Sequence, residues 1–322
     1  MSAAKTLPVL TTALLLLAAC ATDPLRTPAP IATSVAMHCG QQPVVLKFSG
    51  DELLVQMGEN RWQMEAAISA SGARYQAADD ETSWLWTKGN TATLVLDGQS
   101  WPQCLEPGAL EKPFEARGNE PFWHLAADNG ILTLTRPGAI EPQPQTYQTG
   151  TEEGDVVLNT EDNSLTVRIT DAVCRDTMSG MPYPRTVSLE KGSERLEGCG
   201  GSPQQLLQGS DWQVVDLDGD TIAPSPDLTL RFDTEGRVSG RAACNRYMGD
   251  YSLTGEGLTI KQVATTKMAC DAAAMAREQR FLALLAEIDR FDVDDNGELR
   301  LIAADKTVIQ ARLPWAADSD SI

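Results

Sequence analysis

Short runs in which apolar and polar residues alternate dominate the chain beyond its first 34 residues. Between residues 35 and 107, runs of strand length occur at 44–48, 53–57, 62–64, 91–96 and 101–105. Turn-forming triplets such as Ser49-Gly50-Asp51 and Asp97-Gly98-Gln99 separate them. This pattern predicts an antiparallel meander, and so short a meander protects its edge strands best by closing into a small barrel.

The same pattern continues through two further blocks of similar size. In residues 112–202, strand-like runs occur at 131–135, 156–158, 165–169 and 186–189. In residues 205–315, strands are joined by a single long helical pattern. We therefore predict a mainly β protein of three small antiparallel β domains, at 35–107, 112–202 and 205–315.

The helical pattern covers about residues 271–288 and is amphipathic. Glu278 lies on the apolar stripe and must be hydrogen-bonded or paired there, so we expect a partner such as a backbone amide or Asn245. A catalytic acid is the alternative reading of this glutamate. The stripe itself consists of Met275, Phe281, Leu282, Leu285 and Ile288.

Near the end of the third block, the acidic stretch from Asp292 to Asn296-Gly297 begins like a calcium-binding loop. Ala303 stands where such a loop needs its closing bidentate glutamate. Apolar runs flank Asn296-Gly297 on both sides, which favours a β-hairpin with a type I′ turn.

The first 34 residues predict export and a lipid anchor. Lys5 precedes an apolar run that is too short to span a bilayer, so residues 1–19 are expected to be a signal peptide. The sequence Leu17-Ala18-Ala19-Cys20 resembles the bacterial lipobox, which implies a lipid on Cys20. Ala21, in place of aspartate, resembles the signal for the outer membrane of Gram-negative bacteria, facing the periplasm. Residues 20–34 are rich in Pro, Thr and Ala and predict a tether.

The remaining cysteines fit an oxidising compartment. They are six in number, which allows 15 pairings, and sequential pairing is the simplest because it places one bridge in each block. No Cys-x-x-Cys pair is present, and His38 and His124 lie far apart in the sequence, so we expect no metal site and no cofactor. The sequential pairs would be Cys39–Cys104, Cys174–Cys199 and Cys244–Cys270.

The formal net charge is −19 at pH 7. A protein this acidic lacks the basic surface that nucleic acids and anionic membranes require, so neither is an expected partner. The charge fits a cationic partner instead.

A specific set of residues in the first block resembles the membrane-bound inhibitors of c-type lysozyme. These residues are a leading and a closing cysteine, Ser71-Gly72-x-x-Tyr75, Trp86-Thr87-Lys88-Gly89 and Ala92-Thr93-Leu94. The resemblance implies a small β-barrel whose two loops enter the lysozyme cleft. Ser71 would then hydrogen-bond one catalytic carboxylate and Lys88 would pair with the other, while Gly72, Tyr75 and Gly89 would shape the loops.

The segment between Tyr75 and Trp86 departs from this pattern. It is longer than the family leads us to expect, and it carries Asp79, Asp80 and Glu81. An insertion here predicts that Lys88 is displaced relative to Ser71.

Two further resemblances concern the other blocks. The phrases around Gly118-Asn119-Glu120-Pro121 resemble a domain of uncharacterised bacterial envelope lipoproteins. There, Arg117, Glu120 and Asp176 predict either a pocket or, as we prefer, a structural ion pair at a barrel corner. Residues 238–247 and 265–270 resemble the META domain of heat-inducible envelope proteins, which implies a mainly β fold with one helix.

Three functional hypotheses follow. The leading one is a lipid-anchored inhibitor of c-type lysozyme, and the second is an envelope stress-response or binding lipoprotein that acts through the META and middle domains. The third is a hydrolase in the middle domain. The sequence contains no nucleophile elbow, phosphate loop or metalloprotease helix, so we expect no enzyme.

Overall fold

The computed structural model describes residues 33–138 and 143–314. The predicted signal peptide, the lipidation site Cys20 and most of the predicted tether lie outside these residues. Within them, the strands form three sheets of eight or more strands and one two-stranded ribbon, so the prediction of a mainly β protein of three antiparallel domains is confirmed. Among the described residues, no helix has both the length and the apolar character to cross a membrane.

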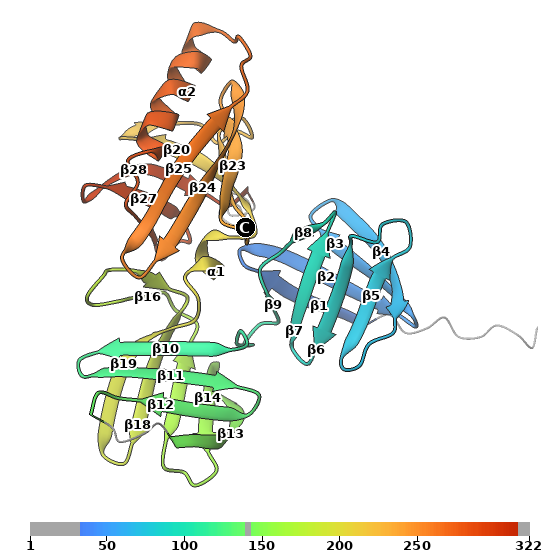
Figure 1. Ribbon diagram of the computed structural model, residues 1–322, viewed down its shortest axis with the longest axis vertical. Coiled ribbons are helices and arrows are strands. Elements are labelled where there is room, and N and C mark those ends of the chain that lie inside the picture. The colour runs from blue at the N-terminus through green and yellow to red at the C-terminus, as the bar shows by residue number, and fades with distance from the viewer. Residues whose placement is uncertain (1–32, 139–142, 315–322) are drawn as a thin grey trace, which may run out of the picture. The chain divides into compact units, whose positions relative to one another are not determined.

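The N-terminal barrel is a sheet that closes on itself (Figure 1). Its neighbours follow the order β6-β5-β4-β3-β2-β1-β9-β7-β8, and β6 also pairs with β7, which completes the ring. The closed barrel expected here is therefore present. Its strands are β1 (Thr33–Cys39), β2 (Gln42–Ser49), β3 (Glu52–Met57), β4 (Asn60–Ala67), β5 (Ala73–Ala77), β6 (Trp84–Lys88), β7 (Thr91–Leu96), β8 (Gln99–Ser100) and β9 (Cys104–Leu105).

The first strand of this barrel differs from the sequence-based expectation. The sequence predicts a tether up to residue 34 and a first strand at 44–48, but residues 33–39 form the strand β1. Val35 and Met37 turn toward the barrel core, and β1 pairs with β2 along its whole length. Pairing with β2 thus makes these residues a strand, although their Thr, Ser and Ala content is typical of a linker.

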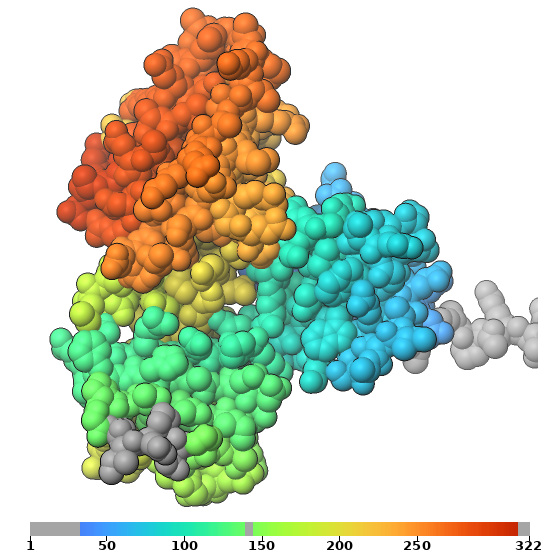
Figure 2. All heavy atoms as spheres, viewed as in Figure 1, coloured from blue at the N-terminus to red at the C-terminus, as the bar shows by residue number. Residues whose placement is uncertain are grey.

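The barrel interior is filled by one apolar cluster. Leu46, Leu53, Val55, Met64 and Leu85 are fully buried. These positions alternate with exposed ones along their strands, as the pleat of a half-buried sheet requires. Figure 2 shows this domain, in blue to cyan, as a continuous body of atoms on the side that faces the viewer. The loops at the ends of this barrel are therefore carried by a packed body.

The middle domain is a closed antiparallel barrel with the strand order β10-β11-β12-β13-β14-β15-β18-β19 (Figure 1). Leu125, Leu132, Val167 and Val187 lie fully buried in its core. A separate ribbon pairs β16 (Cys174–Arg175) with β17 (Pro182–Tyr183). The barrel strands are β10 (Phe114–Asn119), β11 (Phe122–Asp128), β12 (Ile131–Thr135), β13 (Gln143–Glu152), β14 (Asp155–Thr160), β15 (Thr166–Thr170), β18 (Arg185–Lys191) and β19 (Glu194–Gly200).

The C-terminal domain is an antiparallel sheet in the order β25-β24-β23-β22-β20-β28-β27-β26, and β21 pairs with β20. The longer of its two helices packs against it (Figure 1). The elements are α1 (Gln204–Leu207), β20 (Asp211–Leu217), β21 (Asp220–Thr221), β22 (Thr229–Phe232), β23 (Arg237–Ala242), β24 (Asn245–Thr254), β25 (Gly257–Thr265), α2 (Ala272–Leu285), β26 (Arg290–Val293), β27 (Leu299–Ala303) and β28 (Lys306–Arg312).

Helix α2 is shorter than predicted. It ends at Leu285 instead of 288, and the Asp271 side chain caps its first turn by accepting a hydrogen bond from the amide of Ala274 at 2.9 Å. Phe281 and Leu285 are buried on the sheet as expected. Met275 was predicted to share their stripe, but it is exposed because it lies one to two turns earlier, where the helix extends past the sheet's apolar core.

The predicted partner of Glu278 is confirmed. Asn245 donates its backbone amide at 2.8 Å and its side-chain amide at 3.1 Å to the Glu278 carboxylate. The side-chain oxygen of Asn245 accepts hydrogen bonds from Thr266 and from the amide of Met268, both at 2.7 Å. One buried asparagine therefore links the start of β24, the segment before α2, and α2 itself.

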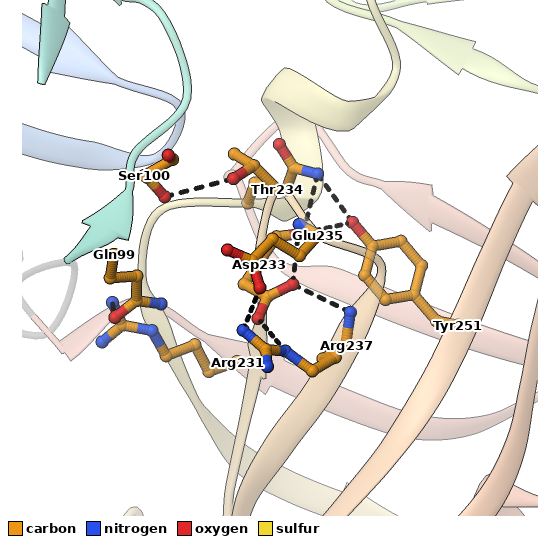
Figure 3. A network of polar contacts seen from close by, with 9 residues as sticks. Gln99, Ser100, Arg231, Asp233, Thr234, Glu235, Arg237 and Tyr251 are labelled. Atoms are coloured by element: carbon orange, nitrogen blue, oxygen red, sulfur yellow. Dashed lines mark hydrogen bonds and ion pairs between the residues drawn. The ribbon is translucent and has the colours of Figure 1, made fainter. Parts of the chain in front are cut away.

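A second polar network shapes the turn between β22 and β23 (Figure 3). The Asp233 carboxylate accepts hydrogen bonds from the backbone amides of Glu235 and Arg237, and from the Arg237 guanidinium at 3.0 Å. The Tyr251 hydroxyl donates to the Asp233 carbonyl at 2.7 Å. These bonds hold the turn against the neighbouring strand β24.

Three disulfides join Cys39 to Cys104, Cys174 to Cys199 and Cys244 to Cys270. This is the sequential pairing. The first bridge links β1 to β9, two adjacent strands that the sequence separates by 65 residues. In the chain-entropy model, a loop of that size gives about 4 kcal/mol of stabilisation.

The hairpin predicted around Asn296-Gly297 forms between β26 and β27, but its turn is not type I′. Gly297 alone has a positive φ, of 78°, and Asp294 hydrogen-bonds Glu298 across the turn. The Asp294 carboxylate also accepts from the amides of Asn296 and Glu298. This aspartate supports a three-residue turn, a geometry in which only the last position is left-handed.

Candidate functional site

The loops that carry Ser71 and Lys88 lie at the same end of the N-terminal barrel. Strands β5 and β6 are antiparallel neighbours, and Ala73 pairs with Thr87. Ser71 and Gly72 directly precede the first residue of that pair, and Lys88 directly follows the second. The register alone therefore brings the two loop tips side by side, and both side chains are exposed.

Gly72 is the residue that allows the two loops to approach so closely. Its φ is +67°, and a Cβ at this position would lie 2.3 Å from the carbonyl oxygen of Thr87. The Trp86 indole donates a hydrogen bond to the Ser71 carbonyl at 2.8 Å, and the Ser69 hydroxyl donates to the same oxygen at 2.7 Å. The position of Ser71 is thus fixed from two sides.

Lys88 ends β6 at a tight turn. Lys88 pairs with Thr91, which leaves Gly89 and Asn90 as the connection, with Gly89 at φ +64°. The Thr91 hydroxyl donates to the Lys88 carbonyl at 3.2 Å. Lys88 forms no ion pair with any residue that the structure describes. Its ammonium is therefore available to a partner while its backbone is held.

Tyr75 occupies a different position from the loop residues. It pairs with Leu85 in the middle of the β5–β6 ladder, and its ring packs on Phe48 with the centroids 5.6 Å apart. It lies against the barrel core. Tyr75 therefore does not lie in the serine loop. Its packing holds β5, the strand that follows this loop.

The acidic insertion lies at the opposite end of the same two strands. Residues 78–83 connect the end of β5 to the start of β6, whereas Ser71 and Lys88 lie at the other ends of these strands. The Asp80 carboxylate accepts from the Ser83 hydroxyl and from the amide and hydroxyl of Thr82, and these bonds lower the pKa of Asp80. The ladder of β5 and β6 therefore separates this loop from Ser71 and Lys88 along the strands.

A hollow lined by both apolar and polar side chains lies beside the serine loop, and the sequence did not reveal it. The hollow has a volume of about 380 Å³, and Ile68 at its edge is 101% exposed. The Arg74 guanidinium stacks on the Trp84 ring at 4.8 Å. The available signal was an isoleucine three residues before a Ser-Gly turn, in an otherwise polar loop. The lining consists of Ile68, Ser69, Ala70, Arg74, Trp84, Trp86 and Thr93.

In the middle domain, the three charged residues singled out from the sequence do not form one site. Arg117 lies 3.9 Å from Glu115 and stacks over Tyr183 at 5.6 Å. Asp176 accepts a hydrogen bond from Asn119 at 3.0 Å and caps the turn at Ser179. Glu120 has no ion pair within the described ranges. The ion pair of Arg117 is therefore local and involves a residue that we had not named.

The described part of the chain contains no cluster of three or more His, Cys, Asp or Glu side chains arranged to hold a metal. All six cysteines in that part are in disulfides and offer no free thiol. Of the residues singled out from the sequence, Ser71 and Lys88 are the pair that the β5–β6 register places at one end of the N-terminal barrel.

The fold defines a disulfide-linked, mainly β protein of three domains. Residues 38–101 match the family model described as membrane-bound lysozyme-inhibitor of c-type lysozyme. Residues 205–314 match the META domain. Two separate parts of the sequence are thus similar to known families, and neither match covers the residues between them.

Two other comparisons add little. A solved structure, described as the NMR structure of the protein from Burkholderia xenovorans, is 30% identical over 34% of this chain and 84% of that chain. Its TM-score of 0.29 is too low for a comparison of folds. No curated protein matches the chain.

Proposed function

We propose that the N-terminal barrel inhibits c-type lysozyme by inserting the Ser71 and Lys88 loops into the active-site cleft. The observation that carries the proposal is the register of β5 and β6, in which Ala73 pairs with Thr87. The match of residues 38–101 to the inhibitor family model suggests the class of partner. The two exposed side chains supply one hydroxyl and one ammonium at a single rim.

The chemistry of the target explains why this pair suits it. Retaining glycosidases hold two carboxylates roughly 5 Å apart in a cleft. An ammonium neutralises one carboxylate and a hydroxyl donates to the other, and neither group offers a glycosidic bond to cleave. Charge pairs that lose their water at an interface couple by about 1.5–7 kcal/mol. Binding is expected to compete with substrate.

Two apolar side chains at the hollow beside the serine loop supply the apolar part of the interface. Exposed Ile68 and the half-buried Trp86 lie next to the loop tip, and Trp86 holds the Ser71 carbonyl. Aromatic and aliphatic anchors around a charged contact exclude water and strengthen it. The loops thus present a polar centre with an apolar border.

The proposed attachment is a lipid on Cys20, with the described domains in the periplasm. A tether that ends before β1, over residues 20–32, would let the barrel reach lysozyme that has passed the outer membrane. In this position the inhibitor protects the cell wall.

The direct test is a turbidity assay of c-type lysozyme on a suspension of bacterial cell walls. The added protein is a soluble form of the chain that begins after Cys20. We expect lysis to slow with increasing protein, and the inhibition to be relieved by excess substrate. If lysis continues at an unchanged rate when the protein is in molar excess over lysozyme, the proposal is refuted.

A further inference from the structure

A groove on the outer face of the META sheet has the size of a ligand site. Its volume is about 870 Å³, within the range of roughly 300–1,000 Å³ typical of small-molecule sites. The core of the domain lies on the other face, where Trp212, Leu230 and Val238 are fully buried. The groove is thus formed by the exposed set of alternating residues on β20, β22, β23, β24 and β25.

Two cross-strand rows form the floor of this groove. In the first row, Arg241 on β23 pairs directly with Arg246 on β24. In the second row, Ser239 pairs with Met248, which pairs in turn with Ala264. The rows are two residues apart along the strands, or about 7 Å.

The first row places two like charges opposite each other, which destabilises a sheet. Arg241 is paired with Asp227 at 3.2 Å, and Arg246 has no ion pair within the described residues. A third arginine, Arg231, also lines the groove and lies 3.7 Å from Asp211, which is the one carboxylate in the lining. Three arginines and one carboxylate thus line the groove, and Arg246 is the arginine without an ion pair among the described residues, on a chain whose net charge is −19.

The second row gives the groove an apolar half. Met248 is 56% exposed on this sheet face. Ala264, Pro226 and Pro314 line the groove as well. An apolar surface therefore lies about 7 Å from a pair of guanidinium groups.

We propose that this groove binds a soluble amphiphilic phosphate monoester. Arg241 and Arg246 hold the phosphate, because two guanidinium groups match its double charge and its oxygens accept their paired N–H donors. The apolar part of the ligand lies over Met248 and Ala264. The surface of an anionic bilayer is disfavoured as a source, since the rest of the protein would be repelled by it.

The test is isothermal titration calorimetry of the soluble chain at low salt with n-octyl phosphate below its critical micelle concentration. Inorganic phosphate supplies the head group alone, and n-octyl glucoside supplies the chain without the charge. We expect n-octyl phosphate to bind at least about tenfold more tightly than either. Equal binding of the glucoside would overturn the phosphate site, and equal binding of inorganic phosphate would overturn the role of the apolar row.

Variants assign the two halves of the groove. R241Q and R246Q should each lower the affinity for n-octyl phosphate by about tenfold. R277Q, which removes an exposed arginine of α2, should leave that affinity unchanged. M248S should weaken the binding of n-octyl phosphate and leave the binding of inorganic phosphate unchanged. If the double variant R241Q/R246Q binds n-octyl phosphate as tightly as the unaltered protein does, the proposal fails. Lysozyme inhibition should be the same in all of them.

Discussion

Lys88 has a backbone held by a turn and an exposed side chain, an arrangement that lowers the entropy cost of binding through a charged group. The turn at Gly89 and the hydrogen bond from Thr91 hold its main chain. A contact made by such a residue keeps more of its interaction energy as affinity.

Replacing Lys88 by alanine should weaken inhibition of lysozyme by at least about 2 kcal/mol, some thirtyfold in the inhibition constant. The reason is that one catalytic carboxylate would then be buried without a cation. The measurement is the inhibition constant in the turbidity assay.

Lys47→Ala is the matched control, because it removes the same charge from an exposed position on β2 of the same barrel. Its inhibition constant should stay within about twofold of the original. An unchanged constant in Lys88→Ala would remove this lysine from the mechanism.

Gly72→Ala should disturb the serine loop. The new Cβ would collide with the Thr87 carbonyl, and a left-handed φ adds about 1–2 kcal/mol of strain. We expect faster hydrogen exchange in β5 and β6 together with weaker inhibition. Gly58→Ala has a similar positive φ with open space around it, so it should show the strain without the loss of inhibition. Equal behaviour of the two variants would contradict the role of the close approach.

Glu111 predicts a pH dependence of stability. It is 8% exposed, and burial raises the pKa of its carboxyl even though the Ser202 amide donates to it. Between the ordinary pKa and the raised one, the folded state binds more protons, so stability contributed here is present at low pH and is lost as the pH rises through the folded pKa.

Glu111→Gln should therefore gain thermal stability relative to the unaltered protein as the pH rises from about 4 to 8. Thermal melts across that range measure it, with the exposed Glu59→Gln as the control. A difference that stays constant with pH would show that the glutamate does not titrate with folding.

At the scale of elements, helix α2 depends on a polar anchor as much as on its apolar side chains. The Glu278 carboxylate accepts hydrogen bonds from the backbone amide and the side-chain amide of Asn245, which is 5% exposed. The disulfide from Cys244 to Cys270 joins the same two regions covalently.

Glu278→Ala should destabilise this junction by about 1–3 kcal/mol, because it leaves the donors of Asn245 unpaired inside the protein. Hydrogen exchange of α2 and of the start of β24 should increase, while exchange in the N-terminal barrel stays the same. Glu278→Gln, which keeps a hydrogen-bond acceptor, should lose less stability than Glu278→Ala. Equal losses in the two variants would show that packing alone holds the helix.

Several elements could be predicted because their determinants are local. The alternating runs of β2, β3 and β7 and the need of Glu278 for a partner can be read from neighbouring residues. Strand β1 could not be predicted in this way, since its Thr, Ser and Ala residues become a strand only through pairing with β2 and β9. The end of α2 and the exposure of Met275 depend on where the sheet stops.

The candidate site shows the same division. The motif serine and lysine were identifiable from the sequence, and the register of β5 and β6 was not. Register decides at which end of the strands a longer loop falls, and that information lies in the pairing of Ala73 with Thr87. The hollow at Ile68 depends on side chains from three strands, which no local pattern reports.

At the scale of the whole molecule, net charge is expected to set the rate at which a charged partner associates. The first domain, residues 35–107, carries nine acidic and four basic residues, and the whole chain has a net charge of −19. A cationic lysozyme is attracted to such a surface over the Debye length, about 10 Å at 0.1 M salt.

The association rate with lysozyme should consequently fall as salt increases, while the dissociation rate changes little. Stopped-flow mixing or surface-based kinetics between about 10 and 300 mM salt measures both rates. The exposed triple variant Asp51→Asn/Glu52→Gln/Glu65→Gln should associate more slowly and depend less on salt. An association rate that is independent of salt would argue against steering.

The far-end position of the acidic loop has a consequence for comparing related inhibitors. Residues 78–83 are remote from the two tips along the strands, so insertions and deletions here leave the tips in place. Alignment gaps between the tyrosine and the tryptophan are thus no sign of lost activity in a homologue. The same turn is a suitable point for attaching a fluorophore or an epitope to follow the protein in living cells.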